Sequence, residues 1–174
     1  MILSEASAVS RRAFTLVEII VVVAIIAIAA LLAVPMLSSA ADVQLRAAAN
    51  MIAADVEYAK SLAITRQRPH SVVFNTTTHA YEVQDESQNA VPHPLNPGVL
   101  AVAFPNDSRL SKVTITAATL TDNTVTFDYL GSPYDGADTS FPLVSGTDVI
   151  TLAAGSMTTT ISIEPVTGYV TIGN

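Results

Sequence analysis

Cysteine is absent from all 174 residues of this chain. Without cysteine, the chain can form neither a disulfide framework nor a metal site with thiolate ligands. The absence does not exclude an oxidising compartment. The length fits one domain, with or without an extension.

Basic residues are scarce in the second part of the chain. From Gln67 onward there are three basic residues against ten acidic ones, a balance of −7 that equals the net charge of the whole chain. The basic residues are Arg68, Arg109 and Lys112. An acidic surface repels phosphate backbones, so the composition argues against a general nucleic-acid-binding protein.

Charge is missing altogether from residues 19–41. About 20 predominantly apolar residues are enough for a helix to cross a bilayer, so this run predicts a membrane span. Arg11 and Arg12 precede the run and Asp42 is the first charge after it. The positive-inside rule then places the N-terminus in the cytoplasm and the rest of the chain outside. Glu18 needs an explanation, because ionisable groups at membrane depth are costly and usually functional.

The segment around Glu18 has three interpretations. A secretory signal would use Arg11 and Arg12 as its basic region and residues 39–41 as its cleavage site. Its apolar region, however, exceeds the usual length of about 7–15 residues. A twin-arginine export signal is suggested by "SRRAFTL", residues 10–16. Neither signal gives Glu18 a role, whereas the third interpretation keeps the segment in the mature protein.

The stretch "AFTLVEII", residues 13–20, resembles the prepilin processing site of type IV pilins and type II secretion pseudopilins. The resemblance implies that a prepilin peptidase cuts between Ala13 and Phe14 on the cytoplasmic side and then methylates the new N-terminus of Phe14. Pro35 falls at the family's helix-bending proline. Ala13 departs from the family's usual glycine, but it is the nearest small substitute, so we expect cleavage to persist.

The same resemblance implies that Glu18 of one subunit pairs with the free amine of Phe14 in the next subunit as the filament assembles. Four residues separate the two positions, which is about 6 Å along a helix. A carboxylate is favoured near a helix N-terminus, and a buried charge pair can fix register. The alternative is that Glu18 simply extends its carboxylate to the membrane interface.

Helical periodicity continues beyond the apolar run. Three- and four-residue spacings place seven apolar residues on one face: Leu45, Ala48, Ala49, Ile52, Val56, Ala59 and Ala63. No glycine or proline occurs between Val43 and Gln67. The pattern predicts one helix from about residue 14 to residue 65 or 66, bent near Pro35, whose second part packs on a globular head.

The residues after Pro69 are typical of short strands. A hairpin is predicted in residues 71–83, and further strands at 99–104, 112–116, 124–129, 149–153, 158–163 and 169–172. Residues 90–98 and 131–140 are rich in proline, glycine and aspartate and are predicted to be loops. The fold class is therefore α+β, a long helix packed on an antiparallel head of two sheets.

Two further stretches resemble one branch of the family, the H-type minor pseudopilins and FimT-type minor pilins. They are the alanine-rich junction at residues 45–74 and the ending "ISIEPVTGYVTI", residues 161–172. Some FimT-like proteins bind DNA through basic residues near the C-terminus. Here that stretch has Tyr169, and no arginine or lysine follows Lys112, so we do not expect nucleic-acid binding.

No motif for catalysis or a cofactor is recognisable. The histidines, His70, His79 and His93, lack metal-ligand spacing and are expected at the surface or in loops. Asp135 and Asp138 are weak candidates for calcium, although aspartate in such loops usually stabilises turns. We therefore expect no enzyme activity, no cofactor and no metal.

These observations together predict a cleaved leader at residues 1–13, a transmembrane and assembly helix at 14–41, an amphipathic helix at 42–68 and a β-rich head at 69–174. The expected function is that of a minor pseudopilin of a type II secretion system, in the bacterial inner membrane. Its expected partners are the prepilin peptidase, other pilins or pseudopilins and the membrane. The alternatives are a minor type IV pilin for adhesion, motility or DNA uptake, and an exported soluble β-protein with a cleaved signal peptide.

Overall fold

The structure is a computed structural model that describes the backbone of residues 14–173 and the side chains of residues 14–30 and 40–173. The predicted leader, residues 1–13, lies outside the described residues. The chain divides into two units, Met1–Leu37 and Ser38–Asn174, and each is described by itself.

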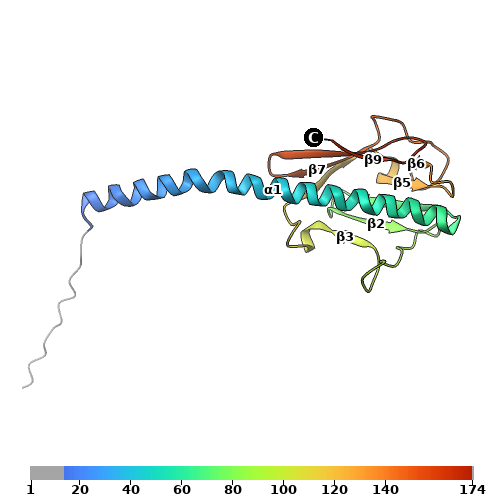
Figure 1. The fold of residues 1–174 in the computed structure, drawn as a ribbon, viewed down its shortest axis with the longest axis horizontal. Helices are drawn as coiled ribbons and strands as arrows, with labels where there is room; N and C mark the ends of the chain where they lie inside the picture. Colours follow the sequence, from blue (N-terminus) through green and yellow to red (C-terminus); the bar gives the residue numbers. More distant parts are fainter. Residues whose placement is uncertain (1–13, 174) are drawn as a thin grey trace, which may run out of the picture. The chain divides into compact units, whose positions relative to one another are not determined.

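One helix, α1 (Leu16–Arg66), contributes to both units (Figure 1). It ends where Gln67 adopts a left-handed conformation with φ 56°, and the amide of Arg68 donates to the carbonyl of Ala63 at 3.2 Å. This is a Schellman-type end, and Pro69 follows it because proline cannot continue a helix. The observed helix lies within two residues of the predicted one at both ends.

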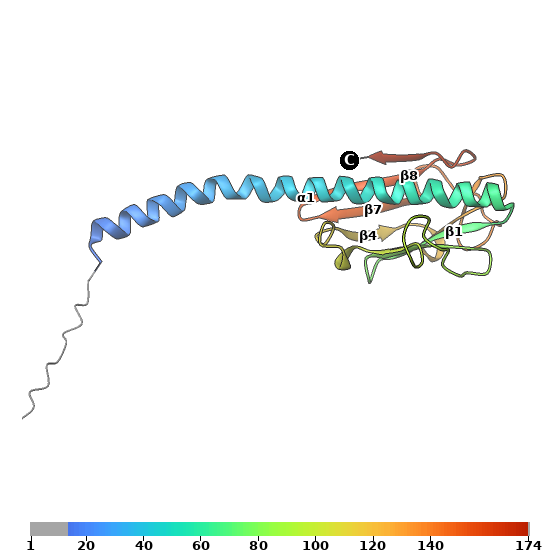
Figure 2. The same cartoon turned by 60° about the horizontal axis from the view of Figure 1, so that its bottom comes forward.

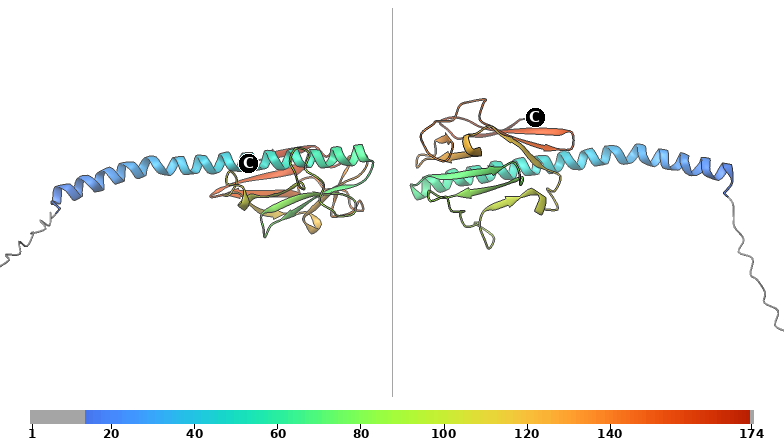
Figure 3. Two further views of the ribbon diagram at one scale, coloured as in Figure 1. Left: turned by 90° about the horizontal axis from the view of Figure 1, so that it is seen from below. Right: turned by 180° about the vertical axis from the view of Figure 1, so that it is seen from behind.

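The part of α1 in the second unit packs on the head through its apolar face (Figure 3). All seven residues predicted for this face are buried, and Ala41 and Leu62 extend it. Four of the seven are alanines, whose small side chains let strands approach the helix backbone closely. The predicted packing of the helix on the head is therefore confirmed.

The head consists of two antiparallel sheets (Figures 1 and 2). The first has the order β3-β2-β1-β5-β6 and the second the order β4-β7-β8-β9. The strands are β1 (His70–Asn75), β2 (Ala80–Gln84), β3 (Ala101–Ala103), β4 (Thr114–Ala118), β5 (Thr124–Phe127), β6 (Pro133–Asp135), β7 (Val149–Ala154), β8 (Met157–Ile163) and β9 (Val170–Gly173). Two short 3₁₀ helices, η1 (Phe104–Asn106) and η2 (Thr121–Asn123), connect them. The predicted α+β fold with two antiparallel sheets is confirmed.

Two predictions about the head are wrong. Residues 133–135, predicted as part of a loop, form β6, which pairs with β5 at the sheet edge, where a proline is tolerated. His70 is not a surface or loop residue, because it is only 1% exposed. His70 begins β1. Its side chain lies on the same, core-facing side of the strand as those of Val72 and Phe74, two and four residues further on.

A single polar contact ties α1 to β2 inside this packing. The hydroxyl of Tyr81 donates to Oδ2 of Asp55 at 2.6 Å, and the ring of Tyr81 stacks near Phe74 and Phe104, with centroids 6.0 Å away in both cases. Burial raises the pKa of the Asp55 carboxyl, although the Tyr81 hydrogen bond opposes this. Burial likewise raises the pKa of Tyr81, with the charge of Asp55 adding to the effect. The hydroxyl therefore stays protonated and keeps donating to the helix.

Replacing Tyr81 should loosen the attachment of α1 to the head. Tyr81→Phe leaves the half-buried Asp55 without its donor, so we expect the free energy of unfolding to fall by about 1–3 kcal/mol at neutral pH. Asp55→Asn is the matched control, because the amide oxygen still accepts the hydroxyl. Chemical denaturation of the full chain in detergent measures both.

The control also has a distinct pH dependence. Because the folded pKa of Asp55 is raised, the folded state binds more protons, and the stability contribution of this group is lost as pH rises above about 3.8. Asp55→Asn should abolish that loss. If Asp55→Asn is as unstable as Tyr81→Phe at pH 7, the loss of stability in Tyr81→Phe does not come from a carboxylate left without its donor.

Candidate functional site

The start of α1 has the geometry of a capped helix. Thr15 precedes the first helical residue, and its Oγ1 accepts a hydrogen bond from the amide of Glu18 at 3.2 Å. Its carbonyl oxygen accepts from the amide of Ile19, also at 3.2 Å. Thr15 is thus the N-cap and Glu18 the third helical residue, the Thr-x-x-Glu spacing of a capping box. The bond uses the backbone amide of Glu18 and makes Thr15 the capping residue, a role that the sequence analysis did not predict although the spacing was visible.

The cap places an exposed carboxylate in the first turn of an apolar helix. The unsatisfied amides of that turn carry partial positive charge, which favours the carboxylate of Glu18 there. Phe14 lies just before the cap and is also exposed. The arrangement can therefore present Glu18 to a cationic group without unwinding the helix. Its pairing with Phe14 of another subunit stays a prediction.

The helix that follows is apolar on every side. Each described side chain of residues 14–30 is exposed. The large apolar ones are Phe14, Leu16, Val17, Ile19, Ile20, Val21, Val22, Val23, Ile25, Ile26 and Ile28. A helix that is hydrophobic all round is normally buried in a core or a membrane, and exposed patches of this size mark interaction sites. The described side chains of this segment therefore form a large exposed apolar surface.

Within the described part of the chain, no helix is both long enough and apolar enough to cross a membrane.

The predicted span at residues 14–41 includes residues 31–39, whose side chains lie outside the described ones. Pro35 is one of them, and the bend predicted there stays a prediction.

The calcium candidates have other partners. Both oxygens of Asp135 accept from Thr121, one from its amide and one from its hydroxyl, each at 2.6 Å. Oδ1 of Asp138 accepts from the amide of Ser140 at 2.8 Å, as aspartate does in turns. Among the described residues, no group of three or more histidine, aspartate or glutamate side chains could hold a metal ion.

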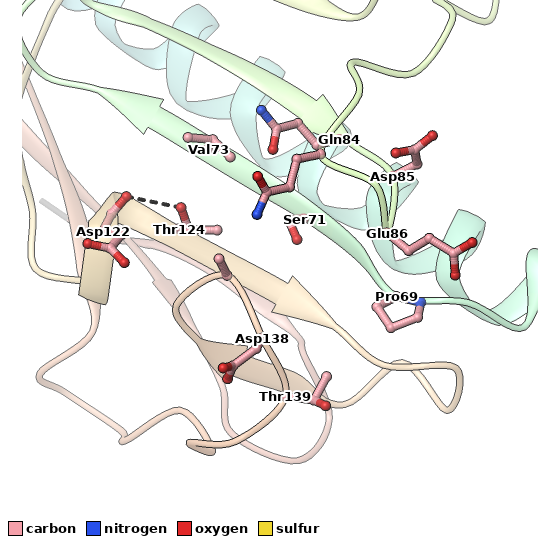
Figure 4. A pocket seen from close by; sticks show the side chains of 12 residues that line it. Pro69, Ser71, Val73, Gln84, Asp85, Glu86, Asp122, Thr124, Asp138 and Thr139 are labelled. Carbon is pink, nitrogen blue, oxygen red and sulfur yellow. Dashed lines mark hydrogen bonds between the residues drawn. The ribbon is translucent and has the colours of Figure 1, made fainter.

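One surface cavity of the head is acidic (Figure 4). It has a volume of about 420 Å³ and lies beside β1, with Asp85, Glu86, Asp122 and Asp138 among its lining residues. Oδ1 of Asp85 accepts from the amides of Ser87 and Asn89, and hydrogen bonding to Asn89 lowers the pKa of this carboxyl. Glu86 forms an ion pair with Arg68, which lies outside the lining.

The other two histidines lie in turns. His79 has a left-handed backbone with φ 50° before β2. Nδ1 of His93 accepts from the amides of Leu95 and Asn96 at 3.0 and 3.1 Å, which holds the loop between β2 and β3. Both positions agree with the loop locations predicted for these histidines.

Two family models match this chain. Residues 48–168 match the family model of the type II transport protein GspH. This chain belongs to the GspH family. The match runs from the amphipathic part of α1 to the turn between β8 and β9, and therefore covers almost the whole head. Residues 9–34 match the prokaryotic N-terminal methylation motif, which contains Ala13, Phe14 and Glu18.

Two crystal structures of the type IV minor pilin FimU of Pseudomonas aeruginosa are similar to this chain. Both are 16% identical to it and cover 75% of it, with TM-scores of 0.47 and 0.46 over 93% and 88% of their own chains. No curated protein matches the sequence significantly.

The GspH match confirms the resemblance to H-type pseudopilins. Together with the methylation motif, it makes the chain a pilin-like subunit, a structural class of protein. The motif links the chain to prepilin processing and to assembly with other pilin-like subunits. The roles of individual residues within the motif stay predictions.

Proposed function

We propose that this protein is a minor pseudopilin, a structural subunit of the pseudopilus of a type II secretion system. The observation that carries the proposal is the GspH match over residues 48–168, which names a type II transport protein. The uncovered apolar start of α1 and the methylation motif support it, because a filament subunit needs both. The proposal assigns the chain no catalysis, cofactor, metal or nucleic acid.

The apolar start of α1 is the proposed anchor. Before assembly, lipid of the bacterial inner membrane covers it, and in the filament the corresponding helices of neighbouring subunits do so. Arg11 and Arg12 before the segment and Asp42 after it favour an N-terminus in the cytoplasm and a head outside. In this arrangement residues 14–41 form the membrane and assembly helix, residues 42–68 join it to the head, and residues 69–174 form the head.

Processing is proposed to occur at the junction of Ala13 and Phe14. Cleavage there removes residues 1–13, including Arg11 and Arg12, and creates a free amine on Phe14, which is then methylated. The capping residue Thr15 lies after the cut, so its hydrogen bond to the amide of Glu18 does not require the leader. The mature helix therefore keeps its start while its terminal charge changes.

Glu18 is proposed to act in assembly through its charge. The carboxylate of one subunit meets the amine of Phe14 of its neighbour inside the apolar helix bundle. Unpaired, either charge would be costly in that environment, so the pair selects one axial register. The Thr15 cap fixes the start of the helix, which leaves Glu18 in the first turn, where it can meet the incoming amine.

Two substitutions separate the charge of Glu18 from its place in the capping box. Glu18→Gln removes the charge but keeps a residue that the capping box accepts, whereas Glu18→Ala removes both. We expect both variants to insert into the membrane and to be cleaved normally, since a neutral side chain costs less in the bilayer. We expect both to lose incorporation into filaments, measured as the fraction that co-purifies with other pilin-like subunits.

The glutamine variant gives the decisive comparison. Native incorporation of Glu18→Gln together with failure of Glu18→Ala would show that Glu18 acts only as a capping residue. Native incorporation of both variants would remove Glu18 from the assembly mechanism and leave the family unchanged.

Deletion of this protein in its own bacterium separates secretion from a pilus. We expect the secreted proteome to lose a set of exported proteins that accumulate in the periplasm, with surface pili and DNA uptake unchanged. Complementation with the full chain should restore secretion. Normal secretion with loss of pili, motility or DNA uptake would instead identify a minor type IV pilin.

A further inference from the structure

The loop that joins β2 to β3 has a tip closed by a histidine side chain (Figure 1). Nδ1 of His93 accepts hydrogen bonds from the amides of Leu95 and Asn96, at 3.0 and 3.1 Å. The tip consists of residues 94–97, and its first and last residues are prolines, which carry no amide hydrogen. The imidazole therefore accepts from both of the amide N–H groups that the tip possesses.

The base of this loop is held by backbone bonds that do not use the ring. Val91 and Leu100 are each 2% exposed, and the amide of Leu100 donates to the carbonyl of Val91 at 2.8 Å. Both residues also form backbone hydrogen bonds with Val83 in β2. The amide of His93 donates to the carbonyl of Gly98 at 3.0 Å, just below the tip. A change at the imidazole can therefore alter the tip while the base stays paired.

The two bonds to the ring define its protonation state. A backbone amide can only donate, so Nδ1 of His93 must present a free lone pair while the tip is closed. The hydrogen of the neutral ring then lies on Nε2. In the charged ring both nitrogens carry hydrogen, and neither can accept. Protonation of the imidazole and closure of the tip by these bonds therefore exclude each other.

The same kind of turn occurs between β1 and β2 with an acceptor that does not titrate. Oδ1 of Asn75 accepts from the amides of Thr77 and Thr78, two and three residues further on, at 3.0 and 2.9 Å. His93 accepts at the same two spacings. Histidine is the side chain that ordinarily changes charge between about pH 5 and 8, whereas asparagine stays neutral. The imidazole thus makes closure of its own turn depend on pH.

The charge that faces His93 comes from α1, since residues 90–98 contain no aspartate, glutamate, lysine or arginine. Burial raises the pKa of the Asp55 carboxyl on α1, whereas the Tyr81 hydrogen bond and the positive charge of His93 lower it. On β2, Tyr81 donates to the same carboxylate. A protonated ring is therefore attracted to Asp55 at the same time as it loses both bonds to the tip.

We propose that the loop between β2 and β3 is a pH-sensitive switch, whose tip is closed while the imidazole of His93 is neutral and opens when the imidazole is protonated. Residues 94–97 are exposed, so water takes up the two amides that the ring releases. The change moves Leu95, which is 88% exposed, so acid alters the apolar surface that the head displays. The proposal concerns the head alone and does not depend on the proposed function.

A spin label at the tip follows the opening. The chain has no cysteine, so Leu95→Cys gives one labelling site in the full chain in detergent. The electron paramagnetic resonance spectrum should show an immobilised label at about pH 8 and a mobile fraction that is several-fold larger at about pH 5. Thr77→Cys is the matched control, because Thr77 holds the corresponding place in the Asn75 turn, and its label should not respond to pH.

Three substitutions, each combined with the Leu95 label, assign the response to one group. His93→Asn supplies an acceptor that does not titrate, so the label should stay immobilised at both pH values. His93→Ala supplies no acceptor, so the label should be mobile at both. Asp55→Asn should keep the native response, because the switch lies in the lone pair of Nδ1 and not in the carboxylate.

Four results would overturn the proposal. The first is equal mobility of the Leu95 label at both pH values in the native background. The second is an equal response of the Thr77 label, which would show a general loosening of the head in acid. The third and fourth are a response that persists in His93→Asn and one that disappears in Asp55→Asn, since another group would then control the tip.

Discussion

The small-residue face of α1 is the contact on which the head depends. Ala48, Ala49, Ala59 and Ala63 are completely buried, and they let strands of the core approach the helix backbone. Larger residues at these positions would hold the sheets away from the helix and leave the Tyr81 hydroxyl out of reach of Asp55. The helix is thus fixed to the head by close packing together with polar contacts such as the part-buried hydrogen bond from Tyr81 to Asp55.

The start of α1 differs from the part that packs in the head, because its apolar side chains are exposed. The described side chains from Phe14 to residue 30 are exposed. A helix that is satisfied at one end and uncovered at the other is suited to a subunit that is complete only in an assembly. Thr15 caps the start of this segment and lies after the proposed cleavage site. Cleavage therefore changes the charge of the terminus and leaves the start of the helix unchanged.

Local patterns predicted much of this fold from the sequence. The three- and four-residue spacing from Leu45 to Ala63 and the lack of glycine and proline predicted α1 and its buried face. Alternating β-branched residues predicted most strands. The order of strands depends on pairings between distant segments, such as Val72 with Val125, which no local pattern encodes. His70 was misplaced because a histidine before an apolar run gives no sign of which side of the strand it occupies.

The candidate sites, like the fold, combine features that are local in the sequence with features that depend on distant segments. The methylation motif, Phe14 and Glu18 are contiguous in sequence and were recognisable there. The Thr15 cap was equally local and was missed. The positive φ of Val166 could not be predicted, because a β-branched residue seldom adopts a left-handed conformation.

The mature N-terminus tests the central claim, that the apolar helix is kept and begins at Phe14. Mass spectrometry of the protein purified from membranes of its own bacterium should find a chain that starts with N-methylphenylalanine at position 14 and still contains residues 15–41. A chain that starts near Ala41 would contradict the account and identify an exported protein with a cleaved signal.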